Sequence, residues 1–205
     1  MTDYDRSTGL LVVDVQNDFA DPAGSLYVPG GGEVVPVIDA EIGRARAAGS
    51  LVFYTQDWHP ERTPHFAQDG GVWPVHCVQG TWGAEFHPDL DVVGPIVRKG
   101  SNGEDGYSGF SMRDPETGET RPTELAALLG AESVTRLVVV GLATDYCVRE
   151  TVLDARQHGY PTTVLQDGIR AVDLQPGDGD RAIEAMLAAG ALLESRTPDK
   201  PAPAG

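Results

Sequence analysis

Short apolar runs alternate with amphipathic segments along this chain. The run at residues 10–15 is rich in valine, and residues 137–141 contain three consecutive valines. Short runs of this composition are typical of parallel strands that are buried on both faces. Further strands are expected at residues 51–56, 95–98, 162–166 and 191–193.

Helices are expected between these strands. Residues 34–48 predict one helix, with Pro36 in its first turn and Gly49 after its end. A second helix should start at Thr144, a good N-cap residue, and end at Gly159, and a third covers residues 180–189. Because strands and helices alternate, we expect an α/β fold of three αβα layers around a central, mostly parallel sheet.

The length of 205 residues fits one domain, which we place at residues 1–195. Residues 196–205 are rich in proline and are expected to form a flexible tail. Residues 57–118 show little regular pattern and contain many Gly, Pro and His residues. Loops of that length in a compact domain usually carry function.

The formal net charge of −16 disfavours partners that are themselves anionic. Such a surface repels nucleic acid and anionic lipid, so we expect neither partner, and a neutral or cationic small molecule suits the field better. No apolar run approaches the roughly 20 residues of a membrane span, and the first residues do not resemble a signal peptide. We therefore expect a cytoplasmic protein in which Cys77 and Cys147 are free thiols.

Chemically active residue types follow several predicted strands. Asp14, Lys99 and Cys147 each lie at or just beyond a strand end. Open parallel sheets bind ligands beyond the C-terminal ends of their strands, so these residues are expected to meet. Near a helix start, Cys147 would be favoured as a thiolate nucleophile, although a buried structural cysteine is the alternative.

The two partners of that cysteine have both catalytic and structural interpretations. Asp14 could cap a loop, or it could act as the general base for the thiol. Lys99 could be a surface lysine, or it could hold the charges of a carboxylate and a thiolate in place. Together the three residues would do the work of a Cys/His/Asn triad with a carboxylate as the base.

A second group of residues indicates a metal site. Asp57 and His59 are two residues apart and would face the same side of an extended segment, and His65 and His76 follow. Carboxylate and imidazole ligands suit one divalent ion, with zinc preferred and iron or manganese as alternatives. His87 and Cys77 are instead interpreted as structural and packing residues.

Two aromatic residues, Phe19 and Trp73, lie within a few positions of the proposed catalytic or metal groups. Rings on opposite walls of a pocket would hold a flat heteroaromatic substrate.

Five motifs together resemble the nicotinamidases (pyrazinamidases) of the isochorismatase-like superfamily. They are Leu11-Val-Val-Asp14-Val-Gln-Asn-Asp-Phe19, Asp57-Trp-His59-Pro, Trp73-Pro-Val-His76-Cys, Arg98-Lys99-Gly, and Gly141-Leu-Ala-Thr-Asp-Tyr-Cys147-Val. The similarity covers nearly the whole chain. It implies an isochorismatase-like fold and hydrolysis of nicotinamide to nicotinic acid and ammonia through a cysteine thioester, with pyrazinamide as a further substrate.

The resemblance also implies roles for individual residues. Those roles are a catalytic triad of Asp14, Lys99 and Cys147, metal ligands Asp57, His59 and His76, stacking residues Phe19 and Trp73, an oxyanion hole from the N–H groups of Ala143 and Cys147, and pocket residues Leu142, Tyr107 and Tyr146. His65 lies where some members have a further histidine ligand and others do not. The Leu142–Ala143 bond resembles the family's non-proline cis peptide.

Other functions remain open at this point. Related Cys/Asp/Lys amidohydrolases of other small amides generally lack the metal ligands, and isochorismate hydrolases need no cysteine. A non-catalytic metal-binding protein on the same fold should have lost at least one triad residue, and none is lost here. The oligomeric state, including a homo-oligomer, is left open.

Overall fold

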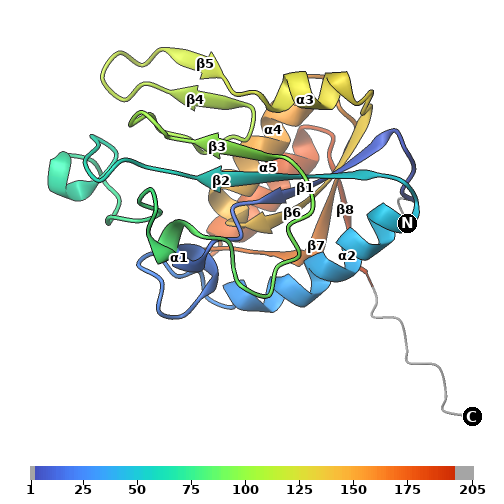
Figure 1. Cartoon of the computed structure of the whole chain (residues 1–205), viewed down its shortest axis with the longest axis horizontal. Coiled ribbons are helices and arrows are strands. Elements are labelled where there is room, and N and C mark those ends of the chain that lie inside the picture. Colours follow the sequence, from blue (N-terminus) through green and yellow to red (C-terminus); the bar gives the residue numbers. More distant parts are fainter. Residues whose placement is uncertain (1–2, 197–205) are drawn as a thin grey trace, which may run out of the picture.

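The computed structural model describes residues 3–196. Apart from its first residue, the expected tail lies outside this range, and the single domain over residues 1–195 stays a prediction. Within the described range, six parallel strands form one sheet in the order β3-β2-β1-β6-β7-β8 (Figure 1). They are β1 (Thr8–Val13), β2 (Leu51–Asp57), β3 (Ile96–Lys99), β6 (Arg136–Leu142), β7 (Thr162–Arg170) and β8 (Leu192–Glu194).

Helices cover both faces of this sheet. On one face α2 (Val35–Ala47) buries Ile38 and Ile42 against alternate residues of β1 and β6. On the other face lie α3 (Leu125–Ala131), α4 (Arg149–Gln157) and α5 (Asp178–Ala188). The expected three-layer α/β architecture is therefore confirmed.

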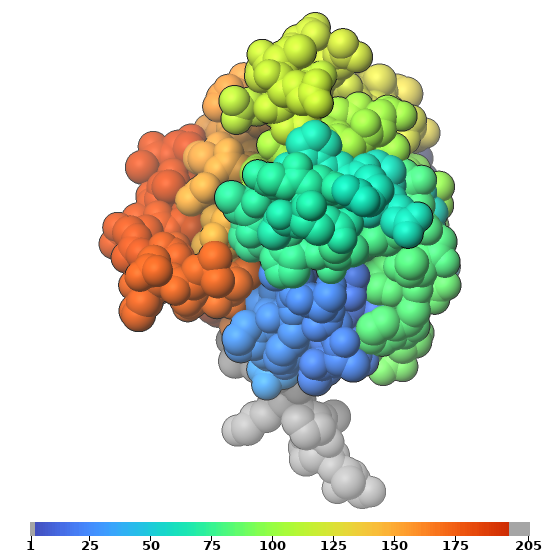
Figure 2. All heavy atoms as spheres, turned by 90° about the vertical axis from the view of Figure 1, so that its left-hand side faces the viewer, coloured from blue at the N-terminus to red at the C-terminus, as the bar shows by residue number. Residues whose placement is uncertain are grey.

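The strand order places a switch point between β1 and β6 at the centre of the sheet. After β1 the chain leads to α2 on one face, and after β6 it leads to α4 on the other face. A crevice forms where such connections diverge, and ligands bind there. Figure 2 shows the surface of the molecule at this end, where the long segment between β2 and β3, coloured cyan to green, covers the middle of the face.

One glycine allows the two central strands to approach each other at this edge. Gly141 has a φ of 120°, and a Cβ added there would lie 2.1 Å from the carbonyl oxygen of Val13. No other residue type could occupy that position without moving β6 away from β1. The close strand pairing brings the ends of the two central strands together.

Several element boundaries differ from the expected ones. β1 ends at Val13 because Asp14 has a φ of 48°, which turns the chain out of the strand. β7 extends to Arg170, beyond the expected end at residue 166, and its pairing with β6 contains a register shift. A 3₁₀ turn, Gly31–Val34, precedes α2.

The helical segment begins at Thr144, as expected, but Thr144 is not its N-cap residue and its first turn is not α-helical. A π-helical turn, Thr144–Val148, follows β6, and α4 begins only at Arg149. The N-cap residue is Ala143, whose carbonyl accepts a hydrogen bond from the N–H of Val148 at 3.1 Å. Wide turns of this kind are frequently found at functional sites.

The loop regions contain further short elements. They are α1 (Asn17–Ala20), 3₁₀ turns at Ala67–Asp69 and Trp82–Ala84, and an antiparallel hairpin of β4 (Ser111–Arg113) and β5 (Thr120–Pro122). In the described part of the chain, no helix has the length and apolar character required to cross a membrane.

Candidate active site

A buried lysine links the ends of three strands. Nζ of Lys99 lies 2.6 Å from Oδ2 of Asp14 and 2.9 Å from Oδ1 of Asp57, and it also donates to the carbonyl of Gly106. The hydroxyl of Thr55 donates to the second oxygen of Asp14 at 2.7 Å. One cation is thus shared by two carboxylates that solvent scarcely reaches.

This arrangement sets the charge states of the three groups. Burial lowers the pKa of Lys99, but the carboxylates of Asp14 and Asp57 outweigh it and hold that pKa well above its usual value. Burial raises the pKa of Asp14 to about 6, against the opposing effect of Lys99. For Asp57 burial also raises the pKa, but Lys99 and His59 lower it below the ordinary value. Lys99 is therefore a fixed ammonium.

Cys147 faces the same carboxylates from the π-helical turn. Its Sγ and one oxygen each of Asp14 and Asp57 all lie within 4.8 Å of one another. Burial raises the pKa of the Cys147 thiol well above its ordinary value, and Lys99 offsets this only in part because both carboxylates add to it. The resting group is thus a protonated thiol, contrary to the thiolate expected from a helix start, and it needs a base.

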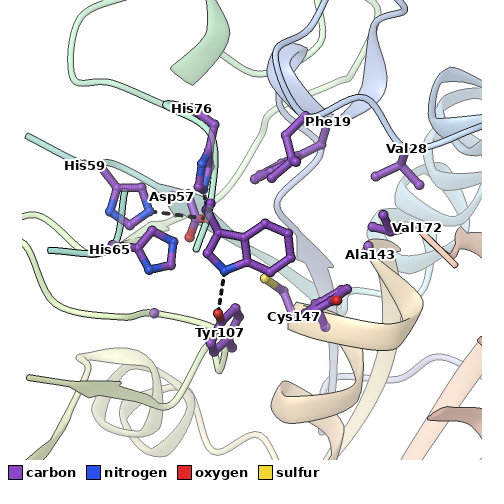
Figure 3. Close-up of a pocket in the computed structure, with 14 residues that line it drawn as sticks. Phe19, Val28, Asp57, His59, His65, His76, Tyr107, Ala143, Cys147 and Val172 are labelled. Carbon is purple, nitrogen blue, oxygen red and sulfur yellow. Dashed lines mark hydrogen bonds and ion pairs between the residues drawn. The ribbon is translucent and has the colours of Figure 1, made fainter. Parts of the chain in front are cut away.

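Three imidazoles meet beside this network. One ring nitrogen each of His59, His65 and His76 lies within 4.8 Å of the others. Oδ2 of Asp57 is 3.8 Å from Nε2 of His59 and 3.9 Å from Nε2 of His76. Figure 3 shows the three rings on one side of the pocket and Cys147 on the other. Asp57 therefore faces the lysine with one oxygen and the histidines with the other.

The hydrogen bonds of these rings decide which nitrogen can act as a ligand. Nδ1 of His76 lies 2.8 Å from the carbonyl of Pro74, which can only accept, so Nδ1 carries the proton. Burial lowers the pKa of His76 to about 4, so its ring is neutral and Nε2 keeps a lone pair. Nδ1 of His65 is likewise bonded to Asp105.

The donor set fits a divalent metal ion. Both ring nitrogens of His59 are buried and have no hydrogen-bond partner among residues 3–196. Unpaired buried nitrogens are costly, and three imidazoles with a carboxylate are the ligands that zinc and similar metals take. The structure also brings His65 into this set.

A pocket of about 470 Å³, part of it open to solvent, joins the cysteine to the histidines. Its aromatic lining residues are Phe19, Trp73, Tyr107 and Tyr146. Nε1 of Trp73 donates to the hydroxyl of Tyr107 at 2.6 Å. The rings of Trp73 and Tyr146 pack edge to face, with their centroids 5.0 Å apart. These contacts hold three rings as one wall of the pocket, and Phe19 lies near His76.

Other predicted residues have mixed outcomes. The Leu142–Ala143 peptide is cis, and Ala143 lines the pocket, as expected. The placement of Leu142 in the pocket is wrong. Leu142 is the last residue of β6, and its side chain is fully buried in the core beneath α2. Cys77 packs in the same core, and both thiols are free. His87 accepts a hydrogen bond from the N–H of Asp89, a structural contact.

Some pocket residues carried no signal in the sequence. Leu26, Val28 and Val172 line the apolar side, and nothing distinguishes them from core residues along the chain. Gln16 holds the backbone of Asp57 through both atoms of its amide. Asp105 lies in a loop without periodicity, and only its position six residues after Lys99 could have suggested it.

Comparison with known proteins agrees with this geometry. The Isochorismatase domain model matches residues 8–197. Nicotinamidase from Escherichia coli (strain K12) is 41% identical over 202 residues, which span 90% of this chain and 92% of that protein.

Two solved structures have a similar fold. Pyrazinamidase of Pyrococcus horikoshii in complex with zinc has a TM-score of 0.82 and 39% identity, covering 93% of this chain and 99% of that one. PnC1 from L. infantum in complex with nicotinate has a TM-score of 0.85 and 34% identity, covering 95% and 96%. The chain belongs to the isochorismatase family.

Proposed function

We propose that this protein hydrolyses nicotinamide to nicotinic acid and ammonia. The observation that carries the proposal is a single pocket with a buried Cys147/Asp14/Lys99 network at one side and a carboxylate with three imidazoles at the other. The similarity to a nicotinamidase and to a protein that holds nicotinate supports the same substrate. Pyrazinamide, a flat ring with the same amide, is proposed as a further substrate.

In the first half of the reaction, Asp14 accepts the proton of the Cys147 thiol, and the sulfur attacks the amide carbon. The backbone N–H groups of Ala143 and Cys147 stabilise the oxyanion that forms. Asp14 then returns the proton to the leaving nitrogen, so that ammonia departs and a thioester remains. Lys99 keeps Asp14 oriented throughout, because its ammonium is bonded to that carboxylate.

In the second half, Asp14 accepts a proton from water, which attacks the thioester carbon. The carbon–sulfur bond breaks, the thiol of Cys147 regains its proton, and nicotinic acid leaves. The pKa of about 6 for Asp14 suits both tasks, since the carboxyl group is ionised at neutral pH and still basic enough to take a proton.

Asp57, His59, His76 and His65 would hold one divalent ion, and zinc is our assignment, with iron or manganese as alternatives. The zinc complex of the pyrazinamidase from P. horikoshii supports this choice. When bound, such an ion supplies a positive charge that orients a ring nitrogen and polarises water. Phe19 and Trp73 would stack on the ring, with Tyr107 and Tyr146 shaping the pocket.

The cellular setting is also a proposal. The acidic chain and a neutral small-molecule substrate fit an enzyme of the cytoplasm that needs neither nucleic acid nor membrane.

Ammonia release from nicotinamide by the purified protein tests this function. We expect turnover by the wild type and none above background for Cys147→Ala, with the metal content of the two proteins equal by elemental analysis. Surviving activity in the variant would mean that another residue is the nucleophile. If the protein hydrolysed another small amide but not nicotinamide, a related amidohydrolase would be favoured instead. If it hydrolysed neither at millimolar substrate, the proposed enzymatic function would be wrong.

A further inference from the structure

One carboxylate at the edge of the site has no part in the scheme above. Nδ1 of His65 lies 2.6 Å from Oδ1 of Asp105, whose side chain is 23% exposed while that of His65 is 5% exposed. A carboxylate accepts, so Nδ1 donates the hydrogen bond and Nε2 is the nitrogen left with a lone pair.

We propose that Asp105 is a positioning residue of the metal site, which fixes His65 in the tautomer and orientation needed for a ligand. The inference rests on the metal site of the proposed function. Metal-bound histidines commonly donate their second ring nitrogen to a carboxylate, which fixes the ring and makes it more basic. Asp105 would supply this contact for His65, as the carbonyl of Pro74 does for His76.

The backbone around Asp105 is anchored well enough for this role. Its N–H donates to the carbonyl of Arg113 at 2.7 Å, and its own carbonyl accepts from Arg113 at 2.8 Å. The hydroxyl of Thr63 donates to the carbonyl of Gly103 and accepts a hydrogen bond from the N–H of His65. His65 is thus connected to the loop that carries Asp105 at two points, through its ring to Asp105 and through Thr63 to Gly103.

This loop is also the part of the chain that completes the rest of the site. It begins after Lys99, its Gly106 carbonyl accepts from that lysine, and the hydroxyl of Tyr107 accepts from Trp73. Asp105 is the residue of this loop whose side chain is hydrogen-bonded to the ring of His65. Removing its side chain takes away the contact to His65 without removing the other two contacts.

Zinc affinity of the full-length, metal-free protein tests this role by competition with a chromophoric chelator. We expect Asp105→Ala to weaken zinc binding about 10- to 100-fold. Asp105→Asn should weaken it less, because the amide oxygen can still accept from Nδ1. The matched control is Glu104→Ala, which removes a neighbouring carboxylate that is bonded to Asn102, and it should leave the affinity within about twofold.

A second background separates positioning from general loop stability. In a His65→Ala protein, the further change Asp105→Ala should leave zinc affinity unchanged, because the ring that it orients is gone. The proposal would be overturned if the two substitutions weakened zinc binding additively, or if Asp105→Ala bound zinc as tightly as the wild type. It would also be overturned if the wild-type protein bound no zinc. If Asp105→Ala does not fold by circular dichroism, the Asn variant carries the same comparison. Because zinc binding is measured without substrate, a failure here is distinguishable from a failure of nicotinamide hydrolysis.

Discussion

Lys99 determines how much negative charge this site can hold. It is fully buried between Asp14 and Asp57, and its own pKa stays high because both carboxylates face it. A buried charge whose partner is removed is far more costly than an exposed one. The residue therefore has a structural role as well as its proposed catalytic one.

Replacing this lysine should destabilise the protein. We expect Lys99→Met to lower the free energy of unfolding at pH 7 by about 3–5 kcal/mol, measured with urea, because two buried carboxylates would face each other without a cation. Arg46→Met is the control: that exposed guanidinium lies 3.4 Å from Asp91, and its loss should cost less than about 1 kcal/mol.

The loss of unfolding free energy in Lys99→Met should also depend on pH. Without the lysine, the folded-state pKa of Asp14, already above its unfolded value, should rise further, and that of Asp57 should rise from below its unfolded value to above it. Groups raised in this way contribute stability that is present below the unfolded pKa, about 3.9, and lost as pH rises through the folded pKa. If the difference in unfolding free energy between the wild type and Lys99→Met shrinks on acidification, it supports the shared ion pair of Lys99 with the two carboxylates. A difference that grows contradicts it.

Asp14 predicts a pH dependence of the reaction itself. Its pKa is raised to about 6, chiefly by burial, and a protonated Asp14 cannot accept the thiol proton. We expect kcat/KM for nicotinamide to fall as pH drops through about 6. A constant kcat/KM down to pH 5, at constant metal content, would exclude Asp14 as the base.

At the level of elements, the loop after β3 needs a glycine at its first position. Gly100 has a φ of 72°, and a Cβ there would lie 2.5 Å from Cε1 and Nδ1 of His59. The loop passes so close to the ring of His59, a proposed metal ligand, that a single methyl group would displace the ring.

Gly100→Ala should therefore weaken zinc binding by about tenfold or more, since the ring of His59 must move. Gly103→Ala is a matched control, because its φ of 96° imposes similar backbone strain while the nearest atom, Oγ1 of Thr63, is 3.4 Å away. Chelator competition on both proteins measures the difference. Equal losses in the two variants would assign the effect to backbone strain.

The elements differ in how far the sequence could predict them. Buried strands such as β1 and β6 are evident because both of their faces are apolar. The π-helical turn was not predictable, because it depends on one carbonyl, that of Ala143, accepting from a residue five positions on. The hairpin of β4 and β5 was also missed, since its strands are only three residues long and mostly exposed.

For the molecule as a whole, the metal site joins separate loops and so should contribute to stability. Its proposed ligands come from the end of β2 and from the long segment before β3. A ligand that binds only the folded state stabilises it in proportion to the logarithm of its concentration. Zinc at 100 times its dissociation constant should raise the Tm by about 5–10 °C. A chelator should reverse the rise, and His76→Ala should show little of it; an equal rise in that variant would place the ion elsewhere.

The sequence located the site well at this scale, because parallel strands necessarily bring their ends to one edge. Asp14, Lys99 and Cys147 do meet there, although they lie far apart in the chain. The protonation state of Cys147 could not be predicted in the same way, because it depends on burial and on two facing carboxylates. Leu142 was misplaced because a position next to a pocket residue does not fix the direction of a side chain.

The position of Trp73 gives the molecule its own optical reporter. Of the three tryptophans in the chain, Trp58 packs beneath the guanidinium of Arg98 and Trp82 is 48% exposed, whereas Trp73 lines the pocket. A flat ring that stacks on this indole will change its fluorescence emission. In the Cys147→Ala protein, that signal would report the arrival of an amide that is never cleaved, so occupancy of the pocket can be followed separately from chemistry.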